Sequence, residues 1–302
     1  MDIPIDVTAD IERELLQLQP WMHAYRFAPD TIVGSFKHHG IAESACGPTS
    51  DPELIQRMQS AYDELTSTRD GWQIQTLADR LGSLAGLSAL DIASATGRMS
   101  FLLAERGATD VRGVEIRAEQ VEQAQLVKRL AGSRFAGVSF EHDPSSADSP
   151  TYRDGETYDL VLSMGLLYHL TDPIQHLRNL RRLTRKAALL HTLTHSGQST
   201  LWQLVLEDPR FLTKAVGGVA WVPPHRDLPG LLQSVGFARV EPISYPELSR
   251  WQRRLDGLPR MARLLMPGAA TALQAKLVQR QLRDRAVRLM SPGYHAYIAY
   301  VD

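Results

Sequence analysis

The stretch LDIASATGRMSFLLAERGA, residues 90–108, decides the fold. Its apolar start predicts a strand and its end a helix, joined by a turn of small residues: Ala93, Ser94, Ala95 and Gly97. A nucleotide-like ligand can bind at such a turn, because small residues let the backbone come close and a helix N-terminus follows. The fingerprint GxGxxG is absent, which argues against an NAD enzyme. Taken alone, Asp-x-Ala-x-Ala-x-Gly fits a nucleotide site and a plain tight turn equally.

Strand and helix patterns alternate on both sides of this turn. Strands are expected at 88–93, 110–116, 136–142, 158–164 and 187–193, with helices near 97–106, 118–131 and 173–185. Asp172 caps the last of these helices and Pro173 takes its first position. A further helix and strand follow within 223–243, and 293–301 alternates as a final strand. This order predicts a parallel sheet covered on both faces.

The flanking segments suggest four parts. They are an N-terminal helical cap (1–82), an α/β core (83–245), a helical insertion (246–292) and the final core strand (293–302). The cap combines a capped helix at 8–19, an aromatic stretch at 20–40 and a helical run at 52–82. Residues 247–290 hold ten Lys or Arg against three Asp or Glu. Their Leu and Met residues at helical spacing need a surface to bury, so we expect a basic lid over an acceptor pocket.

The composition of the 302 residues is that of an ordinary globular protein, with 43% hydrophobic residues and a net charge of −1. Such a charge provides no global field toward nucleic acid or membrane. The single cysteine, Cys46, excludes an internal disulfide and fits a reducing compartment. The acidic start lacks a signal-peptide pattern, and no apolar run approaches the roughly 20 residues that span a bilayer. We therefore expect a cytoplasmic monomer or homodimer without a membrane partner.

Acidic residues follow the next two expected strands. Glu115 ends the second strand, about twenty residues after the turn, where a carboxylate holds ribose hydroxyls. Asp143 follows the third strand, where a carboxylate accepts a hydrogen bond from an adenine amino group. Each acid alone fits a solvated loop charge. The ordered set at three consecutive strand ends favours one ligand crevice.

With these residues, the sequence resembles the class I S-adenosylmethionine-dependent methyltransferases over roughly 88–200. The resemblance implies a Rossmann-like, seven-stranded, mostly parallel sheet with an antiparallel final strand and helical cap elements. It also implies that the turn cradles the methionine part of the cofactor, that Glu115 holds the ribose, and that Ile116 and Asp143 contact the adenine. The turn residues would be Asp91, Ala93, Ala95 and Gly97. The family has glycine where this chain has two alanines, and a left-handed alanine costs about 1 kcal/mol or more.

A second stretch, SMGLLYHLTDPIQHLRNL at 163–180, resembles one branch of that superfamily. The branch contains wobble-uridine tRNA methyltransferases and carboxymethyltransferases and their small-molecule relatives, which share Met-Gly-x-Leu-Tyr-His-x-x-x-Pro. The resemblance implies that Met164 lines the cofactor pocket and that Tyr168 faces the transferred group. It extends to Trp21 and His23 and to WVPPHRDLPGLLQSVGF at 221–237.

Departures from the branch bear on the cofactor. Thr68 and Gln73 stand where the carboxymethylating enzymes are expected to carry a tryptophan and a lysine, and the closing strand has no arginine. These differences favour ordinary S-adenosylmethionine over its carboxylated form.

The chemistry of methyl transfer to a hydroxyl or protonated amine needs a base. His169 leaves the fourth strand beside the expected methyl group and is our first choice, with Tyr168 orienting the acceptor. A helix-entry histidine bonded to backbone and a buried aromatic are the alternative interpretations. His23, His38, His39 and His195 are second choices. The substrate would contact residues of the cap and of the later Trp-x-Pro segment: Trp21, His23, Tyr25 and Trp221.

Metal chemistry is not expected, since ten histidines without metal spacing and one cysteine make a zinc site improbable. Three functions remain open. The first is methylation of oxygen or nitrogen in a small molecule, as in natural product biosynthesis. The second is modification of tRNA, which the basic segment 247–290 supports and the net charge of −1 opposes. The third is a protein that binds S-adenosylmethionine without methyl transfer, supported only by the two alanines.

Overall fold

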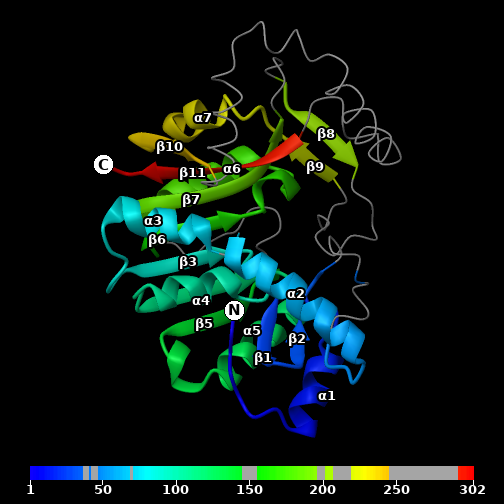
Figure 1. The fold of residues 1–302 in the computed structure, drawn as a ribbon. Coiled ribbons are helices and arrows are strands. Elements are labelled where there is room, and N and C mark those ends of the chain that lie inside the picture. Colours follow the sequence, from blue (N-terminus) through cyan, green and yellow to red (C-terminus); the bar gives the residue numbers. More distant parts are fainter. Residues whose placement is uncertain are drawn as a thin grey trace, which may run out of the picture.

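The computed structural model describes residues 1–36, 41, 47–68, 71–144, 155–195, 201–206, 219–244 and 292–302. They contain a seven-stranded sheet of order β10-β11-β7-β6-β3-β4-β5 (Figure 1). Its strands are β3 (Ser88–Ile92), β4 (Asp110–Glu115), β5 (Val138–His142), β6 (Tyr158–Met164), β7 (Thr184–His195), β10 (Arg239–Ile243) and β11 (Pro292–Tyr300). β11 pairs antiparallel with β7 and β10, whereas the pairs among β3, β4, β5, β6 and β7 are parallel. The expected mostly parallel sheet with an antiparallel final strand is confirmed.

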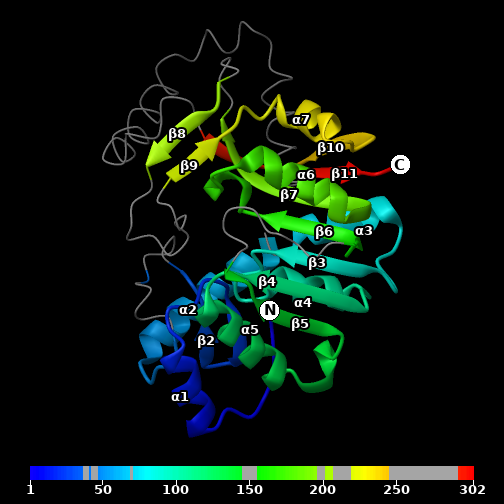
Figure 2. The ribbon, with the colours of Figure 1, turned by 180° about the vertical axis from the view of Figure 1, so that it is seen from behind.

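Helices cover both faces of this sheet. They are α3 (Trp72–Leu81), α4 (Arg98–Glu105) and α5 (Ala118–Leu130) on one face, and α6 (Pro173–Leu183) and α7 (Leu228–Ser234) on the other (Figures 1 and 2). Because successive strand residues point to opposite faces, Leu160 and Leu162 of β6 belong to the same buried cluster as Ile74 of α3. Val161 between them packs in the second cluster with Leu177 of α6.

The helical run expected at 52–82 is two helices, α2 (Pro52–Thr68) and α3. Gly71 has a left-handed φ of 67° and stands at the N-cap of α3, which is why the periodicity does not continue as one helix. α3 also buries Ile74 and Leu77 in the cluster that covers the sheet. Within the segment 1–82 expected as a cap, α3 thus packs in the same buried cluster as the sheet, together with Met1 and Trp21.

Two hairpins lie outside the sheet, in stretches where no strands were expected. One consists of β1 (Tyr25–Ala28) and β2 (Thr31–Val33), between α1 (Ala9–Gln17) and α2, and the other of β8 (Gln203–Leu206) and β9 (Val219–Val222). β9 lies beside η5 (Leu167–His169) and the end of β7. The Tyr25 hydroxyl of β1 donates to the Thr96 carbonyl, so the first hairpin lies next to the turn after β3. The second hairpin lies next to the residues that follow β6.

Of the insertion expected at 246–292, all but the last residue lies outside the described part of the chain, as do His38, His39 and Cys46. Among the described helices none has the length and apolar character needed to cross a bilayer.

The turn between β3 and α4 has the backbone of a glycine-rich loop although only one glycine is present. Ala93 has a φ of 57° and Ala95 a φ of 49°, and Gly97 at 81° completes three left-handed residues at alternate positions. The turn is fixed by Ser94 N–H donating to the Val114 carbonyl at 3.0 Å and by Gly97 N–H donating to the Ser94 carbonyl at 2.8 Å. Left-handed backbone crowds the Cβ of any L-residue, so both alanines are strained.

Gly97 itself is required by packing as well as by its φ. A Cβ at this position would lie 2.4 Å from the Phe140 ring, and one at Gly113 on β4 would lie 2.6 Å from the same ring. Phe140 reaches across from β5 and meets Phe101 of α4 edge-on at 5.2 Å. The turn can therefore exchange glycine for alanine at its two other positions but not at Gly97.

Replacing either alanine by glycine should stabilise the protein. Relief of the left-handed strain raises the free energy of unfolding by about 1–2 kcal/mol. The greater freedom of glycine in the unfolded chain lowers it by about 0.4–1 kcal/mol. We expect Ala93→Gly and Ala95→Gly each to gain roughly 0.5 kcal/mol in urea unfolding. Ala136, exposed with a φ of −56°, is the matched control and should lose stability as glycine. Equal losses at all three positions would contradict the strain.

Candidate functional site

Asp91, the last acid of β3, supports the turn from below. It is 1% exposed, and its Oδ2 accepts a hydrogen bond of 2.7 Å from the hydroxyl of Ser100 in the first turn of α4. Burial raises the pKa of Asp91 to about 7, and the nearby Glu115 adds to the rise, while the hydrogen bonds from Ser100 oppose it. Asp91 thus ties the end of β3 to the start of α4.

Glu115 connects the turn to the end of the next strand. Its carboxylate, 1% exposed, accepts the Ala95 N–H at Oε2 and the Arg117 N–H at Oε1, each at 3.0 Å. The Arg117 guanidinium lies 3.4 Å from the same Oε1. Each carboxylate oxygen has two lone pairs, so these bonds leave acceptor capacity for ribose hydroxyls. The arrangement fits the expected contact with ribose hydroxyls.

The acidic end of the third strand lies beside the second. Asp143 N–H donates to the Glu115 carbonyl at 2.9 Å, and the His142 ring bonds to the Ile116 carbonyl at 2.9 Å. Ile116 and Asp143 are both half-buried. The structure thus brings Glu115, Ile116 and Asp143 together at the carboxyl ends of β4 and β5, as the order of strands predicted.

The residues after β6 form a second compact turn. Gly165 has a φ of 74°, and its N–H donates to the His191 carbonyl of β7 at 2.7 Å. The Tyr168 hydroxyl lies 3.9 Å from the point where a Gly165 Cβ would stand. The Tyr168 ring, 6% exposed, is 4.0 Å from the His169 ring. Met164 begins this turn half-buried against the main core.

The expected substrate residues separate into different environments. Trp21 is 1% exposed in the core, and its indole N–H donates to the Leu15 carbonyl at 3.0 Å. Packing and this bond enclose Trp21 in this structure, and its expected contact with substrate stays a prediction. Trp221 is half-buried on β9, the strand that lies beside η5, so it remains a candidate for the acceptor side.

His23 and Tyr25 contact the turn after β3 instead of an open surface. The His23 Nδ1 lies 2.8 Å from the Thr96 Oγ1, and the Tyr25 hydroxyl donates to the Thr96 carbonyl at 2.6 Å. Burial, reinforced by the charge of Arg98, lowers the pKa of His23 to about 3, so the imidazole is neutral near pH 7. Burial also raises the pKa of Tyr25. Both residues support the turn in this structure.

Thr96 and Arg98 are functional residues that were not expected from the sequence, although both lie within residues 90–108. Thr96 is fully buried, and the Arg98 Nη1 donates to the Ala24 carbonyl at 2.6 Å. Their partners lie about seventy residues earlier in the chain. No local pattern signals such a pairing.

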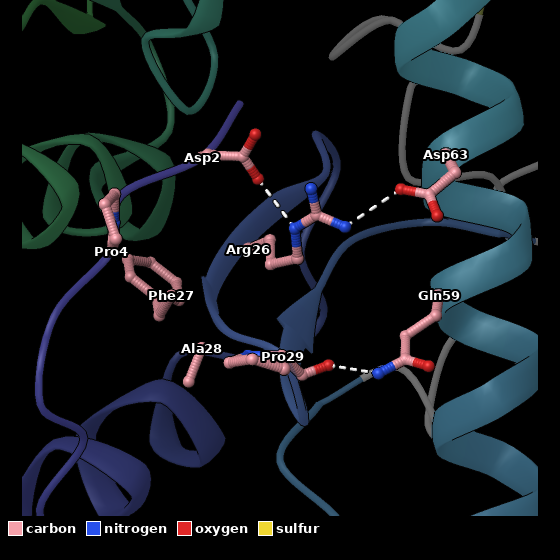
Figure 3. Close-up of a pocket in the computed structure, with 8 residues that line it drawn as sticks. All are labelled: Asp2, Pro4, Arg26, Phe27, Ala28, Pro29, Gln59 and Asp63. Atoms are coloured by element: carbon pink, nitrogen blue, oxygen red, sulfur yellow. Dashed lines mark hydrogen bonds and ion pairs between the residues drawn. The ribbon is translucent and has the colours of Figure 1, made fainter.

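A hollow of about 400 Å³ opens elsewhere, between β1 and α2 (Figure 3). Arg26 crosses it and pairs with Asp2 at 2.7 Å and with Asp63 at 2.9 Å. Its lining contains none of the expected site residues. In the described part of the chain, no three His, Cys, Asp or Glu side chains gather as metal ligands.

The raised pKa of Asp91 predicts a pH-dependent stability of the cofactor-free protein. Between about pH 4 and 7 the unfolded Asp91 ionises while the folded one stays protonated, so stability is present below pH 4 and lost as the pH rises. Asp91→Asn should remove this loss, which unfolding at several pH values would measure relative to the parent. Asp159 is the matched opposite: the Arg185 partner lowers its pKa against the effect of burial, so Asp159→Asn should cost stability above pH 4. A parallel pH profile for Asp91→Asn and the parent would refute the prediction.

A family model described as a methyltransferase domain matches residues 83–244, more than half of the chain. The tRNA U34 carboxymethyltransferase of Idiomarina loihiensis is 26% identical over 200 residues, which cover 63% of this chain and 58% of that protein. The enzyme of the same name from Marinobacter nauticus is 25% identical over 257 residues, covering 78% and 69%. The chain thus spans little more than half the length of the first of these relatives.

Among solved structures, the N-terminal domain of EvdMO1 with SAH bound is 19% identical, with a TM-score of 0.57, and covers 80% of this chain and 92% of that one. At this identity the likeness bears on the fold alone, and it agrees with the sheet described above. The matched family model spans the sheet from β3 to β10, the strained turn and η5. The chain therefore belongs to the methyltransferase-domain family, which confirms the resemblance to class I S-adenosylmethionine-dependent methyltransferases.

Proposed function

We propose that this protein transfers a methyl group from S-adenosylmethionine to a small-molecule acceptor. The observation that carries the proposal is the turn after β3. It keeps three left-handed residues, at 93, 95 and 97, in a chain that supplies only one glycine there. Strain of this kind persists where the surrounding structure enforces it and is concentrated at functional sites.

The residues around the turn fit the cofactor. Ala93, Ala95 and Gly97 leave the backbone open to the methionine part, with Asp91 as the support beneath. Glu115 would accept from the ribose hydroxyls, while Ile116 and Asp143 would contact the adenine. Met164 would line the pocket between the turn and η5. When bound, the cofactor supplies an electrophilic methyl group on a sulfonium.

The acceptor side would be formed by η5 and β9. His169 would remove the proton of a hydroxyl or ammonium acceptor, and Tyr168 would orient it. Trp221, on the strand beside η5, would contribute apolar surface to the acceptor. A base is needed only where the acceptor carries a proton that must leave.

Methyl transfer is favoured over carboxymethyl transfer, although the relatives are named for the latter. Gln73 lies buried on α3 where those enzymes are expected to carry a lysine, and β11 has no arginine. The net charge of −1 favours a small acceptor over RNA. The relatives' names favour tRNA, so RNA remains the second candidate.

Calorimetric titration with S-adenosylmethionine and S-adenosylhomocysteine tests the shared premise. Incubation with methyl-labelled cofactor, in parallel with a small-molecule extract and with total tRNA, then separates the acceptors. Label in the small-molecule fraction supports the proposal. Label in tRNA would replace it with the second candidate. Binding without label in either fraction would indicate a binding protein that transfers no methyl group.

His169→Ala should lower turnover about 10²- to 10⁴-fold, the range for loss of a general base. Cofactor affinity should change little, because the interaction lost belongs to the transition state. The parent rate should rise with pH as the imidazole loses its proton, and His169→Gln, which retains polarity without basicity, should be as slow as the alanine variant. Near-parental turnover in both variants would move the base to another residue.

A further inference from the structure

The hairpin of β1 and β2 touches the turn after β3 at three points. Tyr25 bonds the Thr96 carbonyl, His23 bonds the Thr96 hydroxyl, and Arg98 bonds the Ala24 carbonyl. The Arg98 guanidinium also lies 5.6 Å from the Tyr25 ring. Three consecutive residues at the entry to β1, 23–25, thus contact Thr96 and Arg98, which flank Gly97.

The position of Thr96 makes these bonds act on the strained backbone. Its peptide unit lies between left-handed Ala95 and left-handed Gly97, and the bond from Tyr25 fixes the direction of its carbonyl. From the other side, the Glu115 carboxylate accepts the Ala95 N–H. The backbone from 95 to 97 is therefore held from both the hairpin and the sheet.

The hairpin is itself anchored, so it can hold the turn in place. Arg26, the next residue, pairs with Asp63 of α2, and the Gln59 side chain donates to the Pro29 carbonyl (Figure 3). Tyr25 and Phe27 point inward to the core, whereas Arg26 points to α2. One face of β1 is fixed to α2 and the other to the turn.

We propose that His23 and Tyr25 are positioning residues that hold the turn after β3 in its cofactor-binding shape. In this proposal, the bonds from the hairpin hold Ala93 and Ala95 in the left-handed conformation, which the glycines found elsewhere in the family adopt without strain. His23 then acts as a neutral hydrogen-bonding partner of Thr96 and not as a base. The proposal rests on the proposed function, since it concerns the affinity of the same turn for S-adenosylmethionine.

The test is a double-mutant cycle read by calorimetric binding of S-adenosylhomocysteine. Tyr25→Phe should weaken binding about 3- to 10-fold in the parent, the effect of one lost hydrogen bond. In the Ala93→Gly/Ala95→Gly background the same change should cost less than about twofold, because a glycine turn needs no support. Tyr300→Phe is the matched control: its hydroxyl bonds Glu241 of β10, away from the turn and the hairpin, so binding should stay at the parental level.

A second pair of variants keeps the test independent of the folding of Tyr25→Phe. His23→Leu should weaken binding, and His23→Asn, which can still bond the Thr96 hydroxyl, should restore most of it. Unchanged binding in Tyr25→Phe and His23→Leu would overturn the positioning role. An equal loss in the alanine and glycine backgrounds would also overturn it, since the hydroxyl would then act on the fold as a whole. A parent protein that binds no S-adenosylhomocysteine would instead overturn the proposed function.

Discussion

The contact on which the site depends is the pair of bonds that His23 and Tyr25 make with Thr96. A strand that turns directly into a helix at a sheet edge must reverse its backbone within a few residues, and here it does so through three left-handed residues. Glycine adopts that shape without strain, whereas alanine adopts it only where neighbouring groups over-determine it. The bonds to Thr96, the Glu115 carboxylate on Ala95 and the ring of Phe140 on Gly97 are those neighbours. The turn is therefore a tertiary feature, although its residues are contiguous.

This dependence explains how the N-terminal segment and the sheet form one site. The strand order places β4 and β6 on either side of β3, so Glu115 and Met164 flank the turn from opposite sides. The remaining side is taken by β1, fixed to α2 through Arg26. Glu115, Met164 and β1 thus surround the turn, and each belongs to an element that packing already fixes in the fold. Such support keeps the residues expected to contact the cofactor rigid.

The mostly parallel sheet and its antiparallel final strand could be predicted from the sequence, because strand periodicity indicated the strands and the family resemblance implied how they pair. The same reasoning placed Glu115, Ile116 and Asp143 at one edge, since carboxyl ends of parallel strands meet there. It failed where a residue's role depends on a distant partner. Trp21 was expected to contact substrate, and the sequence pattern gave no sign that the Leu15 carbonyl and the core enclose it in this structure. Thr96 looked like one more small turn residue, yet its carbonyl accepts a hydrogen bond from the hydroxyl of Tyr25, 71 residues earlier in the chain. Gly71 within 52–82 indicates a helix break, but the helical periodicity on both sides of it favoured one continuous helical run.

Hydrogen bonding and burial also divide the described histidines. His176 bonds the Ser163 hydroxyl deep between β6 and α6, and burial lowers its pKa to about 4. His195 is fully buried with its Nε2 on the Leu201 carbonyl, and His23 serves Thr96. A general base works best with a pKa near the working pH and within reach of solvent or substrate. The lowered pKa makes His176 and His23 poorly suited to the task, and full burial does so for His195. His169 differs because it leaves β6 half-buried beside Tyr168, at the edge where the turn after β3 also ends. The proposed base is thus the histidine that lies half-buried beside Tyr168 on η5, next to β9.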